Sequence, residues 1–545
     1  MKASSTSPAP DAVPIRSAVW VELATLAGLC AFLFFFGLGS VGLIGADEPR
    51  YPQVAREMLA RHDWITPVLD GIAWLEKPPL YYWGAMLSYR VLGVTDWASR
   101  VPTAAMATAL LFAVYLFVRR FRPGSQLDAA LIVGSSIGVV GFARAASTDM
   151  PLTATFTIAM LAWFTWLEIG KKLWLLVFYA FIALGTLAKG PVAPVLAALI
   201  IVVFAGLQKE WSLITRTLWW PGIVLFLGIA LPWFVLVQVR NPQFLRVFIL
   251  QHNLARYSTD AFRHRQPFWY FIPVIILGLL PWSLLAIAGA VRSLRDWLHS
   301  QTPEISDLQL FLFLWGLLPV LFFSISQSKL PGYVLPAVPA FGMLAANWIA
   351  QQSSAGEKPH FWLLALHSAI SGMLLGGVLL VNYSLLHIKP GSLAAWVAGT
   401  AAALTFVAIM VSVRVSGVRL LRFVTLLPLV LGLGFVVRYA APTIDSRLSA
   451  RPVEREIATI ETTRSTLAVF EVSRQLEFGL TFYRNQPVHR YERGEIPAGE
   501  HILVALAGSQ TRVQERVAGR RVSRIGEYPP QKLEFYWVQA AARSH

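Results

Sequence analysis

Residues that can do chemistry gather in five short motifs of this sequence, each with a proline close by. Residues 47–50 read Asp-Glu-Pro-Arg, and residues 76–79 read Glu-Lys-Pro-Pro. The stretches 144–151, 189–191 and 326–333 each add a lysine or an arginine, and the first of them also adds an aspartate. A carboxylate can act as a base or bind a cation, and a lysine can act as a point charge on phosphate. The motifs therefore predict a site for proton transfer, for a metal ion or for an anionic substrate.

Each motif also has a purely structural interpretation. Asp47 and Glu48 suit the first turn of a helix, where carboxylates favour the positive end of the dipole. Asp149 suits a helix N-cap, and Glu76 with Lys77 can form a surface ion pair. The local pattern leaves both interpretations open, so the surrounding elements have to decide between them.

The composition identifies the elements that must position these motifs. Of 545 residues, 56% are apolar and only 14% are charged, whereas soluble domains carry about 25% charged residues. This is too little charge to cover the several cores that a soluble protein of this length would need. The composition therefore excludes a soluble enzyme, a disordered chain and a fibrous repeat, and it indicates a multi-span membrane protein.

A membrane span needs roughly 20 apolar residues, and on that basis the sequence predicts about thirteen spans. The first apolar run, 18–44, is too long for the core of a signal peptide, so we expect it to be retained as a span. The other spans are expected near 100–118, 127–145, 151–168, 173–189, 191–207, 218–239, 268–291, 308–325, 331–350, 361–382, 393–413 and 421–439.

The spans divide the chain into three parts. Residues 1–17 are rich in Ser, Pro and Ala and are predicted to be a disordered cytoplasmic segment. Residues 18–440 are predicted to form a transmembrane catalytic domain, with long outer loops at 45–99 and 240–267. Residues 441–545 are richer in charge and are predicted to be a small soluble α/β domain on the outer side. Its strand-like runs are 466–472, 476–482, 501–505 and 533–537.

The charge excess has a topological meaning. Lys and Arg number 46 against 30 Asp and Glu, which gives a net charge of +16. With a cytoplasmic N-terminus, every even-numbered loop is short and basic, as the positive-inside rule requires, so we expect no nucleic-acid partner. Lys77, Lys189 and Lys329 break this rule, because they fall on the outer side in turns with proline or glycine. They predict a phosphate-bearing substrate at the outer face.

The outer loop 240–267 contributes His252, Arg256 and His264, but the two histidines lack the spacing of a tight metal site. The chain contains no HExxH, no Walker loop and no GxGxxG that follows a strand and opens a helix. We therefore expect no nucleotide cofactor. The single cysteine, Cys30, excludes a disulfide within one chain.

The motifs and their order resemble a known family over roughly residues 40–340. This family is the bacterial 4-amino-4-deoxy-L-arabinose lipid A transferases, which are polytopic glycosyltransferases of the GT-C type, similar to protein O-mannosyltransferases. The resemblance is carried by Asp47-Glu48-Pro49-Arg50-Tyr51, Glu76-Lys77-Pro78-Pro79-Leu80-Tyr81, Asp149-Met150-Pro151-Leu152, Lys189-Gly190-Pro191 and Lys329-Leu330-Pro331-Gly332-Tyr333.

The resemblance implies an enzyme of the bacterial inner membrane whose active site and C-terminal domain are periplasmic. Its donor would be undecaprenyl-phosphate aminoarabinose and its acceptor a phosphate of lipid A, a modification that confers resistance to cationic peptides such as polymyxin. We expect a monomer among membrane lipids. Because the reaction needs no enzyme nucleophile, we also expect direct displacement with inversion at the anomeric carbon.

The resemblance and the chemistry of each side chain together suggest the residue roles. The expected catalytic carboxylates are Asp47, Glu48 and Asp149. The expected phosphate-binding cations are Lys77, Arg50, Arg144, Lys189, Arg256 and Lys329. The substrate cavity is expected to be lined by Tyr81, Tyr82 and Tyr333. By the resemblance, a divalent metal, with zinc favoured, would be held by Glu76 and His252, with His264 as a substitute.

Two other functions stay open at this point. The same fold can move another sugar from a polyprenyl phosphate to a protein or a glycan, and Asp47 would then be a necessary base. A lipid flippase or transporter is disfavoured, because the sequence has no internal repeat and its charged motifs gather on one side rather than at the midplane.

Overall fold

Long apolar helices make up most of the molecule. The computed structural model describes residues 15–248, 266–299, 303–355, 359–385, 393–517 and 519–540. Within these ranges, nine helices are long and apolar enough to cross a membrane, and the number reaches eleven if each of two bent helix pairs is one span. Two shorter apolar helices, Val19–Phe35 and Val192–Leu207, lie at two further predicted spans. The predicted multi-span helical architecture is confirmed.

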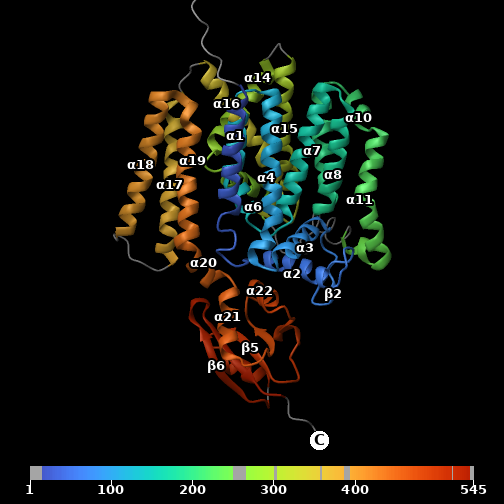
Figure 1. The fold of residues 1–545 in the computed structure, drawn as a ribbon, viewed down its shortest axis with the longest axis vertical. Helices are drawn as coiled ribbons and strands as arrows, with labels where there is room; N and C mark the ends of the chain where they lie inside the picture. Colours follow the sequence, from blue (N-terminus) through green and yellow to red (C-terminus); the bar gives the residue numbers. More distant parts are fainter. Residues whose placement is uncertain are drawn as a thin grey trace, which may run out of the picture.

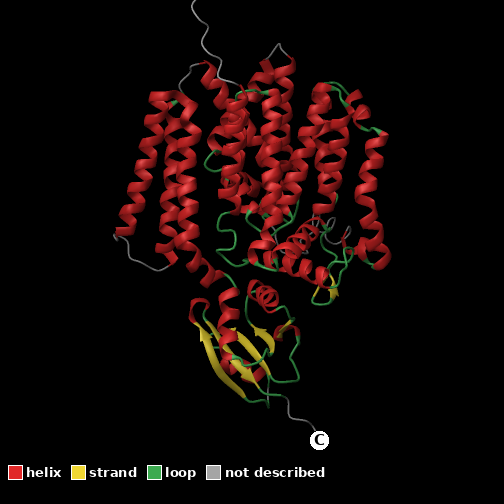
Figure 2. Cartoon of the chain, in the orientation of Figure 1, coloured by secondary structure: helices red, strands yellow, loops and turns green. Residues whose placement is uncertain are grey.

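The membrane helices stand side by side in one bundle (Figure 1), and the strands lie almost entirely at one end of the molecule (Figure 2). The helices of the bundle are α1 (Ile15–Cys30), α4 (Asp96–Phe121), α5 (Gln126–Ser135), α6 (Ile137–Ala143), α7 (Asp149–Ile169), α8 (Lys172–Lys189), α9 (Val192–Leu207), α10 (Ser212–Thr217), α11 (Trp220–Arg240), α13 (Phe271–Gly278), α14 (Ser283–His299), α15 (Pro303–Ile325), α16 (Val338–Ala355), α17 (Phe361–Leu385), α18 (Leu393–Ser416) and α19 (Leu421–Phe435). Short helices at the ends of these are η1 (Ala31–Phe35), η3 (Phe268–Tyr270), η4 (Pro331–Ala337), η5 (Gly417–Leu420) and η6 (Val436–Ala440).

The first predicted span, 18–44, is helical only as far as Phe35. After η1 the chain runs without regular structure to α2 (Asp47–Ala60). Gly37 has a φ of +61°, a left-handed conformation that favours glycine. The prediction was therefore wrong at its end, because apolar composition alone does not show where the backbone leaves the helix.

Three arginines satisfy the carbonyl groups of this non-helical segment. Every backbone carbonyl from Phe36 to Gly42 accepts a hydrogen bond from Arg100, Arg144 or Arg451, at 2.7–3.1 Å. Buried carbonyls without a partner are costly. We call these three side chains the arginine clamp, and they fix the path along which the chain enters α2.

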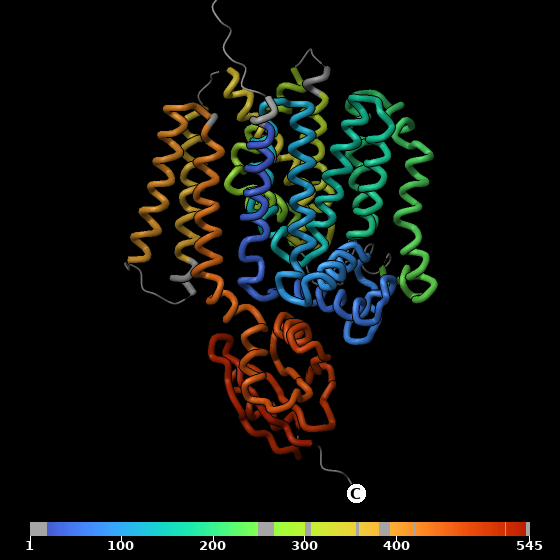
Figure 3. The backbone as a smooth tube through the Cα atoms, in the orientation of Figure 1, coloured from blue at the N-terminus to red at the C-terminus, as the bar shows by residue number. Residues whose placement is uncertain are grey.

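The loop 45–99 forms a layer of its own between the bundle and the C-terminal domain (Figure 3). It consists of α2, an antiparallel hairpin of β1 (Val68–Leu69) and β2 (Ile72–Ala73), and α3 (Leu80–Leu92). The two helices bury a shared apolar core. The hairpin is held to α2 because Glu57 accepts hydrogen bonds from the backbone N–H groups of Asp70 and Gly71, at 3.0 and 3.1 Å.

The C-terminal part is a small α/β domain, as predicted. α20 (Ala441–Leu448) and α21 (Arg451–Ile460) lead from the bundle into a five-stranded sheet with the order β4-β3-β5-β7-β6. β3 lies parallel to β4 and β5, whereas β7 is antiparallel to β5 and β6. The remaining elements are β3 (Thr466–Phe470), α22 (Arg474–Arg484), β4 (Val488–Arg490), η7 (Tyr491–Arg493), β5 (His501–Leu506), α23 (Gln510–Arg516), β6 (Val522–Tyr528), η8 (Pro529–Gln531) and β7 (Leu533–Val538).

One predicted strand, 476–482, is wrong, because these residues lie inside α22. Ser473 caps the helix by accepting a hydrogen bond from the N–H of Leu476, and Asn485 ends it in a left-handed conformation. The alternating apolar residues that suggested a strand are all buried in the helix, which packs both on the sheet and on α2.

The tip of the β1–β2 hairpin carries a carboxyl group with an unusual environment. The pKa of Asp70 is raised from 3.8 to about 6, mainly by burial and then by the carboxylates of Glu57, Glu477 and Glu495, whereas Arg493 acts in the opposite direction. The native state therefore holds this proton more tightly than the unfolded state does. Stability is lost as the pH rises from about 4 to about 6, and the ionised form stays unfavourable above that range.

We predict that Asp70→Asn stabilises the protein at neutral pH, because the amide removes this buried charge. The midpoint of thermal unfolding of the purified, detergent-solubilised full chain should be higher for the variant at pH 7.5, and the difference should vanish towards pH 4. Glu527→Gln, at a carboxylate whose side chain is 55% exposed, is the control and should show no pH-dependent difference. A variant less stable than the wild type at pH 7.5 would contradict the prediction.

Candidate active site

Helix α2 brings the first motif to one face. Asp47 opens the helix, where its charge favours the positive end of the dipole, and Arg50 and Tyr51 follow one turn later on the same side. Asp47 forms an ion pair with Arg50. The Asp47 side chain is 54% exposed, whereas that of Arg50 is only 8% exposed. The motif therefore presents one accessible carboxylate that is held by a buried guanidinium.

Aromatic rings surround the Arg50 guanidinium. Its central carbon lies 4.8 Å from the ring centre of Trp74, 5.3 Å from that of Phe478 and 5.7 Å from that of Tyr51. Of the buried polar atoms that have no hydrogen-bond partner within the part of the chain that the structure describes, three belong to this cluster: Arg50 Nε, Trp74 Nε1 and Tyr82 Oη. All three carry a hydrogen, so they can donate to an anion or to the oxygens of a sugar.

The second half of the cluster comes from the membrane helices. Asp149 opens α7 and pairs with Lys189, the last residue of α8. The Lys189 ammonium lies 4.9 Å from the ring centre of Tyr333. A Cβ at Gly332 would come within 2.4 Å of Asp149 Oδ1 and 3.0 Å of the Phe142 ring, so only glycine permits this approach. The motifs at 149, 189 and 332–333 therefore meet at one point.

Tyr51 links the two halves. Burial raises the pKa of its hydroxyl well above the usual value. The Asp47 and Asp149 carboxylates raise this pKa further, and Arg50 opposes them. A single phenol therefore lies within the electrostatic reach of both carboxylates and stays protonated, ready to donate a hydrogen bond.

The two adjacent acids, Asp47 and Glu48, have different surroundings. Both oxygens of Glu48 accept hydrogen bonds from Arg100, at 2.7 and 2.9 Å, and they also accept the backbone N–H groups of Ile44 and Ala146, at 2.8 and 3.0 Å. These contacts give Glu48 a structural role, and its catalytic role stays a prediction. Asp47 keeps an exposed oxygen and remains the catalytic candidate.

The predicted phosphate-binding cations divide in the same way. Arg144 is not directed at the cluster, because its guanidinium donates to the carbonyls at the end of the first span as part of the arginine clamp. Lys329 is buried and donates to the carbonyl of Ser326 in the turn before Tyr333. Lys77 is half-buried in the loop that precedes α3.

The three predicted cavity tyrosines also differ. Tyr81 is fully buried and donates to the carbonyl of Ser99 at 2.9 Å, so it belongs to the core between α3 and α4. Tyr82 is equally buried, but its hydroxyl is among the unpartnered atoms beside Arg50. Tyr333 packs against Phe271 and Phe323 and faces Lys189. Tyr82 and Tyr333 thus border the cluster, and Tyr81 supports it.

Of the three predicted metal ligands, only Glu76 lies among the residues that the structure describes. Glu76 is half-buried, and its charge acts on both Arg50 and Tyr82. Phe248 packs against Gly190, which follows Lys189 in its turn. Phe248 precedes His252 by four residues in the sequence. His252, Arg256 and His264 lie outside the described residues. Among those that are described, no three His, Cys, Asp or Glu residues gather closely enough to hold a metal ion.

A cavity of about 620 Å³ borders the cluster. It lies between α6, α13 and η4, and its wall includes Phe142 and Pro331, on either side of the contact between Gly332 and Asp149. Most of its other lining side chains are aliphatic, Tyr270 being the main exception. The volume lies within the range of small-molecule sites, and the lining suits a hydrocarbon chain.

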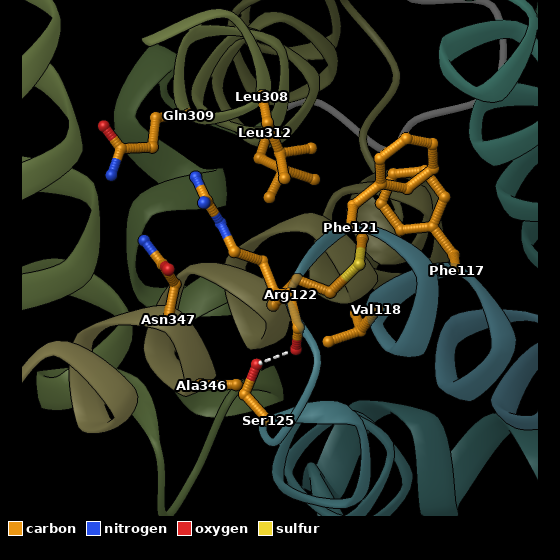
Figure 4. A pocket seen from close by; sticks show the side chains of 11 residues that line it. Phe117, Val118, Phe121, Arg122, Ser125, Leu308, Gln309, Leu312, Ala346 and Asn347 are labelled. Carbon is orange, nitrogen blue, oxygen red and sulfur yellow. Dashed lines mark hydrogen bonds between the residues drawn. The ribbon is translucent and has the colours of Figure 1, made fainter. Parts of the chain in front are cut away.

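Two other cavities lie away from the cluster. One of about 230 Å³ lies between α6, α17 and α19, and it shares Ile137 and Gly141 of α6 with the wall of the first cavity. The other has only about 20 Å³, room for about one water molecule. Figure 4 shows Arg122 in this small pocket, directed between Gln309 and Asn347. This pocket lies at the C-terminal end of α4, whereas the N-terminal end of α4 lies beside the layer of α2 and α3. The pocket is therefore no part of the site.

Comparison with known proteins agrees with this architecture. The family model described as dolichyl-phosphate-mannose-protein mannosyltransferase matches residues 76–236. A protein of Aeromonas hydrophila named undecaprenyl phosphate-alpha-4-amino-4-deoxy-L-arabinose arabinosyl transferase is 29% identical over 80% of this chain and 81% of its own length. Proteins of the same name from Aeromonas salmonicida and Pseudomonas aeruginosa are 31% and 29% identical, and the match spans 64% and 62% of their length, which is less than two thirds.

Solved structures share the fold. ArnT from Cupriavidus metallidurans, bound to undecaprenyl phosphate, superposes with a TM-score of 0.76 at 21% identity, over 96% of this chain and 98% of that one. The archaeal oligosaccharyltransferase AglB from Archaeoglobus fulgidus gives a TM-score of 0.50 at 11% identity, over 93% of this chain and 71% of that one.

The fold and these matches define a class: the chain has the multi-pass helical fold of the membrane glycosyltransferases that it resembles. Within that class, the resemblance to the undecaprenyl phosphate-aminoarabinose arabinosyl transferases that the motifs predicted is confirmed, with 29–31% identity to the three relatives above.

Sequence reasoning gave no role to Tyr51, Trp74, Arg100 and Phe478. Tyr51 carried a readable signal, because it lies four residues after Asp47 and so shares its helix face. Trp74, Arg100 and Phe478 approach α2 from other elements, and no local spacing predicts those contacts.

We predict that the two adjacent acids respond differently to amide substitution. Glu48→Gln leaves the buried Arg100 charge unbalanced, which should cost about 3–5 kcal/mol of stability. Asp47→Asn should unfold close to the wild-type temperature but lose about 100-fold in turnover. Thermal unfolding and glycosyl transfer of both purified variants check this. A Glu48→Gln protein of wild-type stability without turnover would instead restore the catalytic role of Glu48.

Proposed function

We propose that this protein transfers 4-amino-4-deoxy-L-arabinose from undecaprenyl phosphate to phosphate groups of lipid A. One observation carries the proposal: two carboxylate–cation pairs, Asp47–Arg50 and Asp149–Lys189, both act on Tyr51, and Asp149 packs against Gly332, next to Pro331 in the wall of an apolar cavity of about 620 Å³. The relatives named arabinosyl transferases support the choice of sugar and carrier.

The donor's two chemical parts match the two parts of this site. The isoprenoid chain would enter the cavity between α6, α13 and η4, where removal of apolar surface from water favours binding. Its phosphate would then lie at the Gly332 turn, within reach of Lys189. Lys77 and Lys329, on the neighbouring turns, would complete the positive surroundings.

Transfer would be a single displacement. An oxygen of the acceptor phosphate forms a bond to the anomeric carbon, and the bond from that carbon to the undecaprenyl phosphate oxygen breaks, so that the leaving phosphate keeps the electron pair. Preorganised cations stabilise this developing charge, which is usually a large part of catalysis. The configuration at the anomeric carbon inverts.

The acceptor's ionisation sets the role of Asp47. A phosphate is already an anion at neutral pH, so no strong base has to remove its proton. Asp47 would instead stabilise the positive charge that develops on the sugar ring, as carboxylates do near oxocarbenium-like states. Arg50 orients Asp47 through their ion pair.

We further propose a divalent metal, with zinc favoured, held by Glu76 and His252, with His264 as the substitute ligand. The half-buried carboxylate of Glu76 lies close enough to Arg50 and Tyr82 for its charge to act on both, which supports the assignment. When bound, such an ion supplies positive charge to phosphate oxygens.

We also propose a monomer in the bacterial inner membrane, with a cytoplasmic N-terminus and with the site and the C-terminal domain in the periplasm. The basic turns that end α4 and precede α8 lie at the opposite end of the bundle from α2 and the C-terminal domain, which supports this orientation (Figure 1).

Mass spectrometry of lipid A tests the function. We expect that expression of this protein in a strain lacking its own aminoarabinose transferase adds one pentosamine per modified phosphate, and that NMR of the product shows inversion. Asp47→Asn in the same strain should reduce the added mass. An unchanged lipid A profile in the presence of the donor would overturn the proposal, and transfer to a protein or a glycan would favour the other glycosyl-transfer function.

Metal analysis of the purified protein tests the ligand assignment. We expect the double variant Glu76→Ala, His252→Ala to lose the divalent metal that the wild type retains, because two of its ligands are gone. Glu210→Ala, at an exposed carboxylate near the other end of the bundle, is the control and should retain it. Equal metal content in wild type and double variant would overturn the assignment.

A further inference from the structure

The C-terminal domain contacts the helix that carries the catalytic motif. α22 packs against α2, and its side chains Phe478 and Phe482 lie in the same buried cluster as Tyr51 and Tyr82. The contact is also polar, because Arg56 of α2 donates to the carbonyl of Phe482 at 2.9 Å. The domain is therefore not a separate appendage below the membrane part.

Further contacts fix how this domain sits. Tyr483 accepts a hydrogen bond from the N–H of Leu43 at 2.7 Å and donates to Asp96 at 2.5 Å. Arg451 pairs with Asp96 and Asp445 while it holds two carbonyls of the segment before α2. These contacts run from the C-terminal domain to α4 and to the chain that enters α2, so α22 has a defined position on the site helix.

Within this contact, Phe478 is the residue that reaches Arg50. Its ring centre is 5.3 Å from the Arg50 guanidinium carbon, and that of Trp74, from the loop before α3, is 4.8 Å away. The only ion pair the described residues give Arg50 is the one with Asp47, and its Nε has no hydrogen-bond partner among them. The orientation of the guanidinium therefore depends on the aromatic rings around it.

We propose that Phe478 is a positioning residue of the active site, through which the C-terminal domain fixes Arg50 and so sets the direction of Asp47. This inference rests on the proposed function, and it gives the C-terminal domain a part in catalysis. Arg50 is the group that contacts Asp47, and Phe478 acts only through Arg50. Removal of the ring should leave Asp47 present but less well oriented, so the turnover number should fall more than substrate binding weakens.

The same helix offers a matched control. Phe482 lies one turn after Phe478, is equally buried in the same cluster, and has its ring near Arg56 rather than Arg50, at 5.9 Å. Phe478→Leu and Phe482→Leu therefore remove the same ring from the same interface, and only the first should disturb Arg50. Phe478→Tyr keeps the ring and should retain activity.

The test is steady-state transfer from a polyprenyl-phosphate sugar by the purified full chain. We expect Phe478→Leu to lower kcat by about 10- to 100-fold with KM nearly unchanged, and both leucine variants to lose similar thermal stability. Equal kcat losses in Phe478→Leu and Phe482→Leu, or full activity of Phe478→Leu, would overturn the proposal. If Phe478→Leu does not fold, Phe478→Met replaces the ring with a flexible, unbranched side chain that adapts to irregular gaps, and it carries the same expectations.

A structural readout separates this proposal from the proposed function. In cryo-EM structures of wild type and Phe478→Leu, the Arg50 guanidinium should leave the Trp74 ring only in the variant. If the wild type transfers no sugar, the proposed function fails, and this comparison still tests the positioning. An Arg50 that keeps its wild-type place in Phe478→Leu would overturn the proposal whatever the activity.

Discussion

The site depends on how the chain leaves its first membrane helix. From Phe36 to Gly42 the backbone forms no regular helix, and each of its carbonyls accepts a hydrogen bond from the arginine clamp. Arg144 follows α6, Arg100 lies in α4 and Arg451 opens α21. One short segment thus joins three parts of the molecule and delivers Asp47 to a fixed place at the edge of the bundle.

The arginine clamp also explains why the adjacent residues Asp47 and Glu48 have different surroundings. A buried arginine needs a counter-charge, and Arg100 takes Glu48 for this purpose, as Arg451 takes Asp96 and Asp445. Asp47 is left on the outer side of α2 with Arg50 as its partner. Glu48 is therefore held in a buried ion pair with Arg100, whereas Asp47 remains accessible to a substrate.

Several features were predictable from local patterns, and others were not. The long apolar runs predicted the bundle. The outward lysines, together with Asp47 and Asp149, predicted one shared site. The structure brings Lys189, Asp149 and Tyr333 of that predicted site together. The pairing of Glu48 with Arg100 joins residues 52 positions apart, and Phe478 reaches Arg50 from the other end of the chain. Such partners are chosen by tertiary packing, about which periodicity carries no information.

The position of the C-terminal domain has an electrostatic consequence. Charges interact more strongly where water is excluded, and α22 covers α2 on the side away from the bundle, which leaves Arg50 buried while Asp47 stays exposed. A site at the end of a membrane bundle would otherwise face solvent. By covering this arginine, the domain strengthens the pull of its charge on Asp47, whose other side stays accessible.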